Sequence, residues 1–173
     1  MPSYHLLLLL LFLFLTFFSF SFSFSFSVAA KKHTPPRLTT TSSALELAAR
    51  YAAAASISAS NVSAALQLTP ARCRTGPVQD CVVLVDHSAK QLGRASDVLG
   101  RIEPGTAQES QVNDASTWTS AALTDLRTCH DAAQSMPMGP CTRARDTLVR
   151  RLNEALRHTS NALYFISRIS ARP

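Results

Sequence analysis

The chain has 173 residues, with 17 lysines and arginines against 11 aspartates and glutamates, so its formal net charge is +6. It contains only 5 glycines and no Cys-x-x-Cys pair, which argues against a glycine-rich phosphate loop and a zinc site. The Gly-x-Ser-x-Gly and His-Glu-x-x-His motifs of common hydrolases are also missing. We therefore expect a protein that is not an enzyme and that holds no metal or cofactor.

The first thirty residues have the composition of an export signal. A run of Leu, Phe and Ser extends from Leu6 to Val28, and no Lys, Arg, Asp or Glu precedes Lys31. It ends in Val28-Ala29-Ala30, small residues that suit a signal peptidase. We predict that residues 1–30 are a signal peptide cut before Lys31. The alternative is a retained signal anchor, because the run could span a bilayer, but its serines and the missing basic residues favour cleavage.

A short lead-in and a single helical domain follow. Residues 31–42 hold two prolines and a run of Thr and Ser without apolar periodicity, which predicts a flexible segment. Residues 43–173 carry a helical pattern throughout, and their number suits one domain with a real core.

Four helices are predicted in this domain. Ser43-Ala-Leu-Glu46 has capping-box spacing, so the first helix begins at about Ala44 and ends at Leu68, before Thr69-Pro70. Gly76-Pro77 begins the second. The second, third and fourth helices are predicted at about 78–102, 110–133 and 142–170.

Apolar residues in the last three helices recur at steps of three and four, which is typical of helices that pack together. The predicted seams are Cys81, Val85, Ser88, Leu92, Ala95, Leu99 and Ile102; then Ala115, Trp118, Ala122, Leu126, Cys129 and Ala133; then Val149, Leu152, Leu156, Thr159, Leu163 and Ile166. Short connections between helices of similar length predict an all-α fold, an up-down-up-down four-helix bundle stapled by disulfides.

Four cysteines in an exported chain most simply form two disulfides. In the predicted topology all four lie at one pole of the bundle. Cys81 and Cys129 lie on the seams of adjacent antiparallel helices, which favours their pairing. Cys73 and Cys141 would then tie two loops together. Pairing of Cys73 with Cys81 and of Cys129 with Cys141 is the local alternative.

The remaining polar features have ordinary surface interpretations. His33 lies in the lead-in, and His87, His130 and His158 are predicted to be solvated on helix surfaces. Asn61 begins an Asn-Val-Ser glycosylation sequon, which is available after export. Arginines gather on the fourth helix, where a solvated basic face is the ordinary interpretation and weak attraction to an acidic polymer outside the cell is the alternative. These arginines are Arg143, Arg145, Arg150, Arg151 and Arg157.

The third helix carries the most specific pattern. Thr117-Trp-Thr-Ser-Ala-Ala-Leu-Thr124, followed by Thr128-Cys-His-Asp131, resembles the signature of the plant invertase and pectin methylesterase inhibitor family. Gln79-Asp-Cys81 and Thr159-Ser-Asn-Ala-Leu163 resemble it too. The resemblance covers about residues 43–170. It implies an extracellular four-helix bundle with a disulfide between helices two and three, and hence the Cys81–Cys129 pair.

The resemblance also implies a function, namely a one-to-one complex in which the bundle occludes the active cleft of a cell-wall enzyme. Invertase inhibitors carry a Pro-Lys-Phe stretch between helices two and three, where this chain has Glu103-Pro-Gly-Thr-Ala-Gln-Glu109. The pectin methylesterase branch is therefore favoured, with Thr124, Thr128 and Asp131 as candidate contacts. The alternatives are an invertase inhibitor and a non-inhibitory wall module held by its charge on acidic pectin.

One departure from the family pattern stands at the N-terminus. Typical members begin with a helical hairpin that contains two cysteines, whereas this chain has no cysteine before Cys73. We expect the bundle to lack that hairpin, with Cys73 and Cys141 supplying a bridge at another place.

Overall fold

The computed structural model describes residues 41–103 and 109–170, with side chains from Ser43 onward. The predicted signal peptide at 1–30 and most of the predicted lead-in lie outside these ranges. None of the helices in these two ranges combines the length and the hydrophobicity that a membrane span requires.

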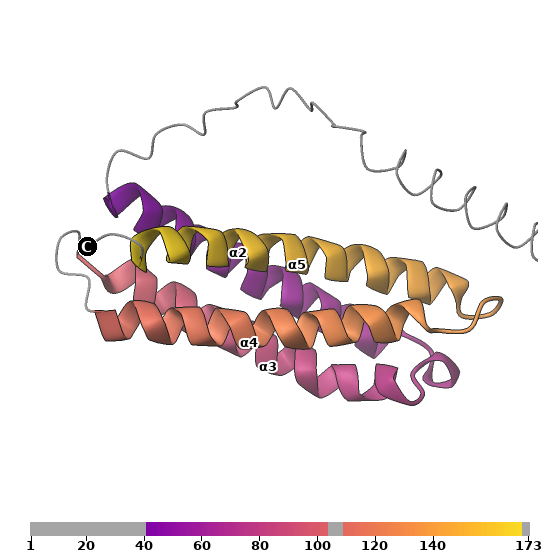
Figure 1. Cartoon of the computed structure of the whole chain (residues 1–173). Coiled ribbons are helices and arrows are strands. Elements are labelled where there is room, and N and C mark those ends of the chain that lie inside the picture. The colour runs from indigo at the N-terminus through magenta and orange to yellow at the C-terminus, as the bar shows by residue number, and fades with distance from the viewer. Residues whose placement is uncertain (1–40, 104–108, 171–173) are drawn as a thin grey trace, which may run out of the picture. The chain divides into compact units, whose positions relative to one another are not determined.

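Residues 41–103 and 109–170 form four long α-helices and one 3-10 helix (Figure 1). This confirms the predicted all-α class, and no strand occurs in the two ranges described. The elements in chain order are α2 (Thr41–Leu68), η1 (Ala71–Cys73), α3 (Pro77–Arg101), α4 (Glu109–Gln134) and α5 (Thr142–Ser170).

The helices form the predicted up-down-up-down bundle. The main interfaces join α2 to α3, α3 to α4, α4 to α5 and α5 back to α2, so each helix packs against two neighbours. Figure 1 shows the four helices lying side by side, with consecutive helices running in opposite directions. The outer face of α4 therefore lies on the opposite side of the bundle from α2.

Two helix starts differ in how well the sequence predicted them. α2 begins at Thr41, so Ser43 lies inside the first turn and the capping box does not mark the start of the helix. First-turn N–H groups have no intrahelical partner, so hydroxyl residues are accepted there. α3 begins at Pro77 as predicted, after Gly76, whose φ of 54° lies in the region that favours glycine.

The core confirms the α3 seam completely, since all seven of its predicted positions are buried. In α4, Trp118 is only half-buried and Thr119 takes its place in the interior. In α5 the predicted seam is wrong by one residue at three positions. The structure buries the residues that precede Val149, Leu156 and Leu163, namely Leu148, Ala155 and Ala162. Two of these are alanines, which let α5 approach its neighbours closely, so the larger leucines pack beside the interface.

Small side chains allow close contact between α2 and α3. Four alanines of α2 are fully buried: Ala48, Ala52, Ala55 and Ala59. Across this interface the Ser56 Oγ donates to the Ala89 carbonyl at 2.9 Å, and the Ser96 Oγ donates to the Ala49 carbonyl at 3.1 Å. These bonds satisfy polar groups inside an otherwise apolar contact.

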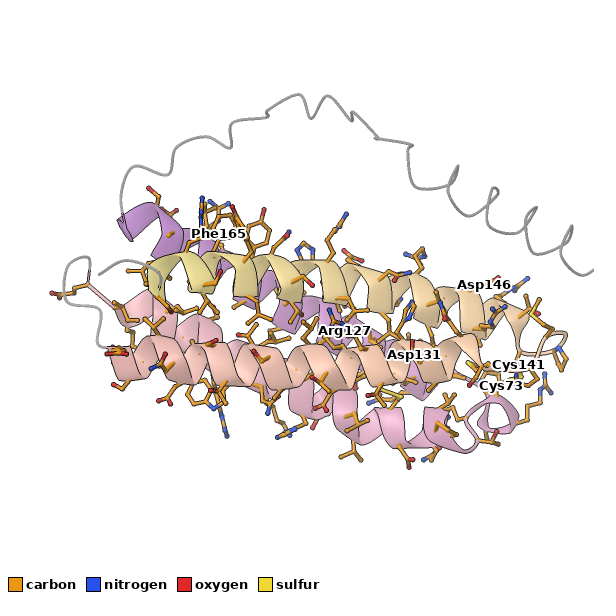
Figure 2. The ribbon with its side chains drawn as sticks, viewed as in Figure 1. Cys73, Arg127, Asp131, Cys141, Asp146 and Phe165 are labelled. Atoms are coloured by element: carbon orange, nitrogen blue, oxygen red, sulfur yellow. A yellow bond between two sulfur atoms is a disulfide. The ribbon has the colours of Figure 1, made fainter. Side chains whose placement is uncertain are left out.

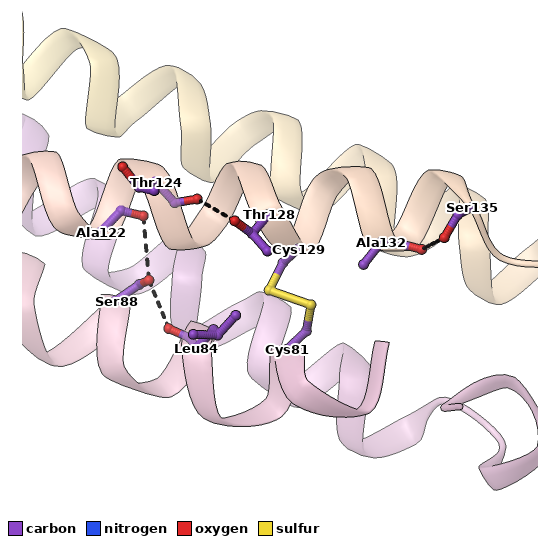
Figure 3. The surroundings of a disulfide bond; sticks show 9 residues. All are labelled: Cys81, Leu84, Ser88, Ala122, Thr124, Thr128, Cys129, Ala132 and Ser135. Carbon is purple, nitrogen blue, oxygen red and sulfur yellow. Dashed lines mark hydrogen bonds between the residues drawn. A yellow bond between two sulfur atoms is a disulfide. The ribbon is translucent and has the colours of Figure 1, made fainter. Parts of the chain in front are cut away.

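Both disulfides lie toward one end of the bundle, as the topology predicted. Cys73 pairs with Cys141, with their Cα atoms 5.7 Å apart, and Cys81 pairs with Cys129, with their Cα atoms 5.4 Å apart. The local alternative is thus excluded in this structure. The first bond ties the α2–α3 connection to the start of α5, and the second ties α3 to α4 (Figures 2 and 3).

Candidate functional site

One side of α4 carries the candidate contact residues. Thr124, Thr128 and Asp131 are exposed and lie within two turns of one another, on the side of the helix opposite its buried seam. The structure therefore brings all three onto one surface. We call this surface the α4 outer face; its exposed residues are Asn113, Thr117, Ser120, Thr124, Arg127, Thr128 and Asp131.

The threonine hydroxyls of this face have a defined orientation. The Thr124 Oγ1 donates to the Ser120 carbonyl at 3.1 Å, and the Thr128 Oγ1 donates to the Thr124 carbonyl at 3.1 Å. The Thr117 Oγ1 donates to the Asn113 carbonyl at 2.9 Å. A hydroxyl has one proton and two lone pairs, so each of these oxygens faces solvent as an acceptor. The Asp131 carboxylate adds further acceptors, and Arg127 is the one cation on this face. Acceptors therefore outnumber donors, and the surface suits a partner that presents mainly donors.

Part of the family signature on α4 is structural. Thr119 and Ala122 are fully buried, and the Thr119 Oγ1 donates to the Ala115 carbonyl at 2.7 Å. Trp118 packs against the core at the end of the bundle remote from the disulfides. The exposed positions of the signature are Thr117, Ser120, Thr124, Thr128 and Asp131, and these are available to a partner.

The Cys81–Cys129 disulfide fixes α4 to α3 directly behind the α4 outer face (Figure 3). Two turns further along α3, the buried Ser88 Oγ lies 2.9 Å from the Leu84 carbonyl and 3.5 Å from the Ala122 carbonyl of α4. A covalent bond and a polar contact thus hold Thr128 and its neighbours in place against α3. Contacts held in this way lose little entropy when a partner binds.

Two of the three helical histidines are placed differently from the sequence prediction. His87 is exposed as predicted, with its Nδ1 3.7 Å from the Asp125 carboxylate of α4. His130 and His158 are half-buried, so their predicted solvation is wrong. The Nε2 of His130 is buried without a hydrogen-bond partner in the described ranges, while its Nδ1 lies 3.6 Å from the Asp131 carboxylate. His158 lies beside Tyr51, with ring centroids 6.3 Å apart.

Charge is distributed unevenly between two adjacent helices. α4 carries four carboxylates and one arginine, whereas α5 carries six arginines and two carboxylates. Among the residues that the structure describes, no group of three or more His, Cys, Asp or Glu side chains is placed to hold a metal ion. The charge counts thus describe an acidic helix, α4, beside a basic one, α5.

Asn61 lies on a different side of the molecule. It is exposed on α2, and its main-chain carbonyl accepts a bond from the Arg151 Nη1 of α5 at 3.2 Å. Because α2 and α4 are not neighbours in the bundle, a glycan on Asn61 would leave the α4 outer face open. Glycosylation at this residue stays a prediction.

The fold and the site define a small helical bundle, stapled by two disulfides, with one exposed helix face that is rich in hydrogen-bond acceptors. The family model of the plant invertase/pectin methylesterase inhibitors matches residues 18–165, and the chain belongs to this family. The match begins inside the predicted signal peptide, so the end of that segment stays a prediction.

Two curated proteins of Arabidopsis thaliana are similar to the chain. Pectinesterase inhibitor 3 is 37% identical over 94 residues, which cover 52% of this chain and 44% of the relative. Pectinesterase inhibitor 9 is 26% identical over 98 residues, which cover 55% of this chain and 47% of the relative. The chain thus spans about half the length of these relatives. No solved structure matches it.

Proposed function

We propose that this protein is a secreted inhibitor of plant pectin methylesterase, that it has no catalytic activity of its own, and that it occludes the active cleft of the enzyme in a one-to-one complex. Family membership and the names of the two relatives support this class of target. The observation that carries the proposal is the α4 outer face, where signature residues lie exposed on a helix that a disulfide fixes to its neighbour. Thr124, Thr128 and Asp131 are its proposed contacts.

The proposed location is the cell wall. The predicted signal peptide at 1–30 would export the chain, and both disulfides need an oxidising compartment to persist. N-terminal sequencing of protein secreted by plant cells should begin at Lys31. A product that stays in the membrane with its leader attached would instead support the signal anchor.

Parallel inhibition titrations test the target. We expect protein secreted from plant cells that express the full chain to abolish methyl-ester release by pectin methylesterase at about one equivalent, near the acidic pH of the wall. Sucrose hydrolysis by invertase should be unaffected. The invertase alternative expects the reverse, and a chain that inhibits neither class across several isoforms would contradict the proposal.

The acceptor role of the hydroxyls is tested by a matched pair of variants. Thr124→Val with Thr128→Val removes two acceptors and keeps the side-chain shape, and each lost hydrogen bond is worth about 1 kcal/mol, or roughly fivefold in affinity. Thr124→Ser with Thr128→Ser keeps both hydroxyls and should inhibit like the natural protein. Both residues are exposed, so melting temperatures should change little. Equal inhibition by the valine and serine pairs would exclude an acceptor role.

A further inference from the structure

A row of arginines runs along the surface of α5, away from the α4 outer face. Arg143, Arg150 and Arg157 are exposed and follow one another at intervals of seven residues. Seven residues are two helical turns, so their Cα atoms lie about 10.5 Å apart along the axis on nearly the same line. None of the three takes part in the ion pairs formed among the described residues. Their guanidinium groups are therefore available to an external anion.

Three shallow surface hollows, open to solvent, follow this row and share its arginines. The first has a volume of about 460 Å³ and lies between the end of α2 and the start of α5, with Arg143 and Arg151 in its wall. The second, of about 640 Å³, also includes Arg143 and extends to Arg150. The third, of about 370 Å³, lies between Arg150 and Arg157. We call the arginine row with its three hollows the α5 track.

The lining of the track suits a sugar acid. Arginine binds a carboxylate through two parallel hydrogen bonds. Thr147 and Asn153 stand between the arginines and can bind sugar hydroxyls. Leu68 and two prolines line the first hollow and offer an apolar surface for the C–H side of a sugar ring.

Two carboxylates limit which polyanion fits. Asp146 and Glu154 also line the track (Figure 2 labels Asp146), so its positive charge is interrupted. A polyanion without hydroxyl groups would place only anionic groups against these carboxylates, at a cost in binding energy. Each unit of a sugar acid also carries hydroxyls, which can donate hydrogen bonds to Asp146 and Glu154 and so offset the repulsion. No aromatic side chain lines the three hollows, so the track lacks the anchors that are typical of protein-binding surfaces.

We propose that the α5 track binds a polyuronate, a polysaccharide with a carboxylate on each sugar unit. The positive charge that attracts the polymer is then concentrated on α5. The α5 track lies apart from the α4 outer face. Binding here would hold the protein on an acidic wall polymer while the α4 outer face stays free for an enzyme. The proposal does not depend on inhibition, because a chain that inhibits nothing could still bind through this track.

Affinity electrophoresis in gels that contain polygalacturonate tests the proposal. The protein is expressed as the full chain in plant cells and purified from the medium. We expect its migration to be retarded, and we expect Arg143→Gln, Arg150→Gln and Arg157→Gln together to weaken binding about tenfold, since each exposed ion pair contributes a few-fold. The matched control carries the same loss of charge on α2 and α3. Its substitutions are Arg50→Gln, Arg94→Gln and Arg101→Gln, and they should change binding less than about twofold.

Several outcomes would overturn the proposal. Equal losses in the two triple variants would mean that net charge alone retains the protein, and equal binding to fully methyl-esterified pectin would exclude carboxylate recognition. Calorimetric titration of pectin methylesterase without polymer separates the two functions. If the α5 triple variant loses enzyme affinity and keeps polymer binding, the track is a protein-docking surface. If only polymer binding is lost, the polyuronate site is supported, whatever the inhibition assays show.

Discussion

Removing the disulfide between α3 and α4 should lower both the stability and the partner affinity of the protein. The bond between Cys81 and Cys129 closes a loop of 48 residues. The loop-closure entropy that the unfolded chain then regains corresponds to about 4 kcal/mol at 25 °C. An unfolding entropy of about 0.27 kcal/mol per kelvin, for roughly 130 folded residues, converts this to a fall in Tm of about 15 °C. Alanine is the right replacement because both sites are buried and apolar.

The second disulfide provides a matched control. Its loop of 68 residues gives a similar loss of about 4 kcal/mol, so C73A/C141A and C81A/C129A should melt within a few degrees of each other. Their inhibition should differ, because only Cys129 lies next to Thr128 on the helix that carries the α4 outer face. Circular dichroism melts and inhibitor titrations at 20 °C measure the two effects. If the C81A/C129A protein melts like the natural one, the predicted loss of stability from loop-closure entropy is wrong. If both variants inhibit equally, the Cys81–Cys129 bond does not support inhibition by holding α4 in place.

The remaining predictions concern stability and are checked by denaturant unfolding. Gly76→Ala should cost about 1–2 kcal/mol because φ is 54° there, whereas Gly100→Ala, in open space within a helix, should add about 0.5–1 kcal/mol. Ala55→Leu should cost about 1–3 kcal/mol of stability, because Ala55 is fully buried and the interior has no room for the larger side chain. Thr159→Val should cost less than about 1 kcal/mol, since the hydroxyl only donates to the Ala155 carbonyl of its own helix.

Much of the fold could be predicted from the sequence because local patterns and topology agree. Every position of the α3 seam is buried, since its steps of four and three hold for the whole helix. Likewise, α3 and α4 are antiparallel, so the start of α3 lies beside the end of α4. Cys81 and Cys129 are therefore at the same height along the bundle axis. The position of Thr124 and Thr128 on one exposed surface follows from helical periodicity alone.

Other features depend on distances between helices that a sequence pattern does not contain. The α5 seam passes through Ala155 and Ala162, because the smallest side chains lie where the helices approach most closely. His130 and His158 are half-buried, although their polarity predicted that they would be solvated. The contact between Arg151 and the Asn61 carbonyl joins residues 90 positions apart. No local signal in the sequence reports such a pair.

Calorimetric titration of pectin methylesterase with a variant of the α4 outer face shows whether this face binds the enzyme. Thr128→Lys places a long charged side chain there, and Ser60→Lys is its control on α2, where the Ser60 Oγ also donates to a carbonyl four residues back, that of Ser56. The natural protein should bind with a stoichiometry of one. Thr128→Lys should bind at least about thirtyfold more weakly, and Ser60→Lys should stay within about twofold. Unchanged affinity for Thr128→Lys would contradict the assignment of the α4 outer face as the enzyme-binding surface.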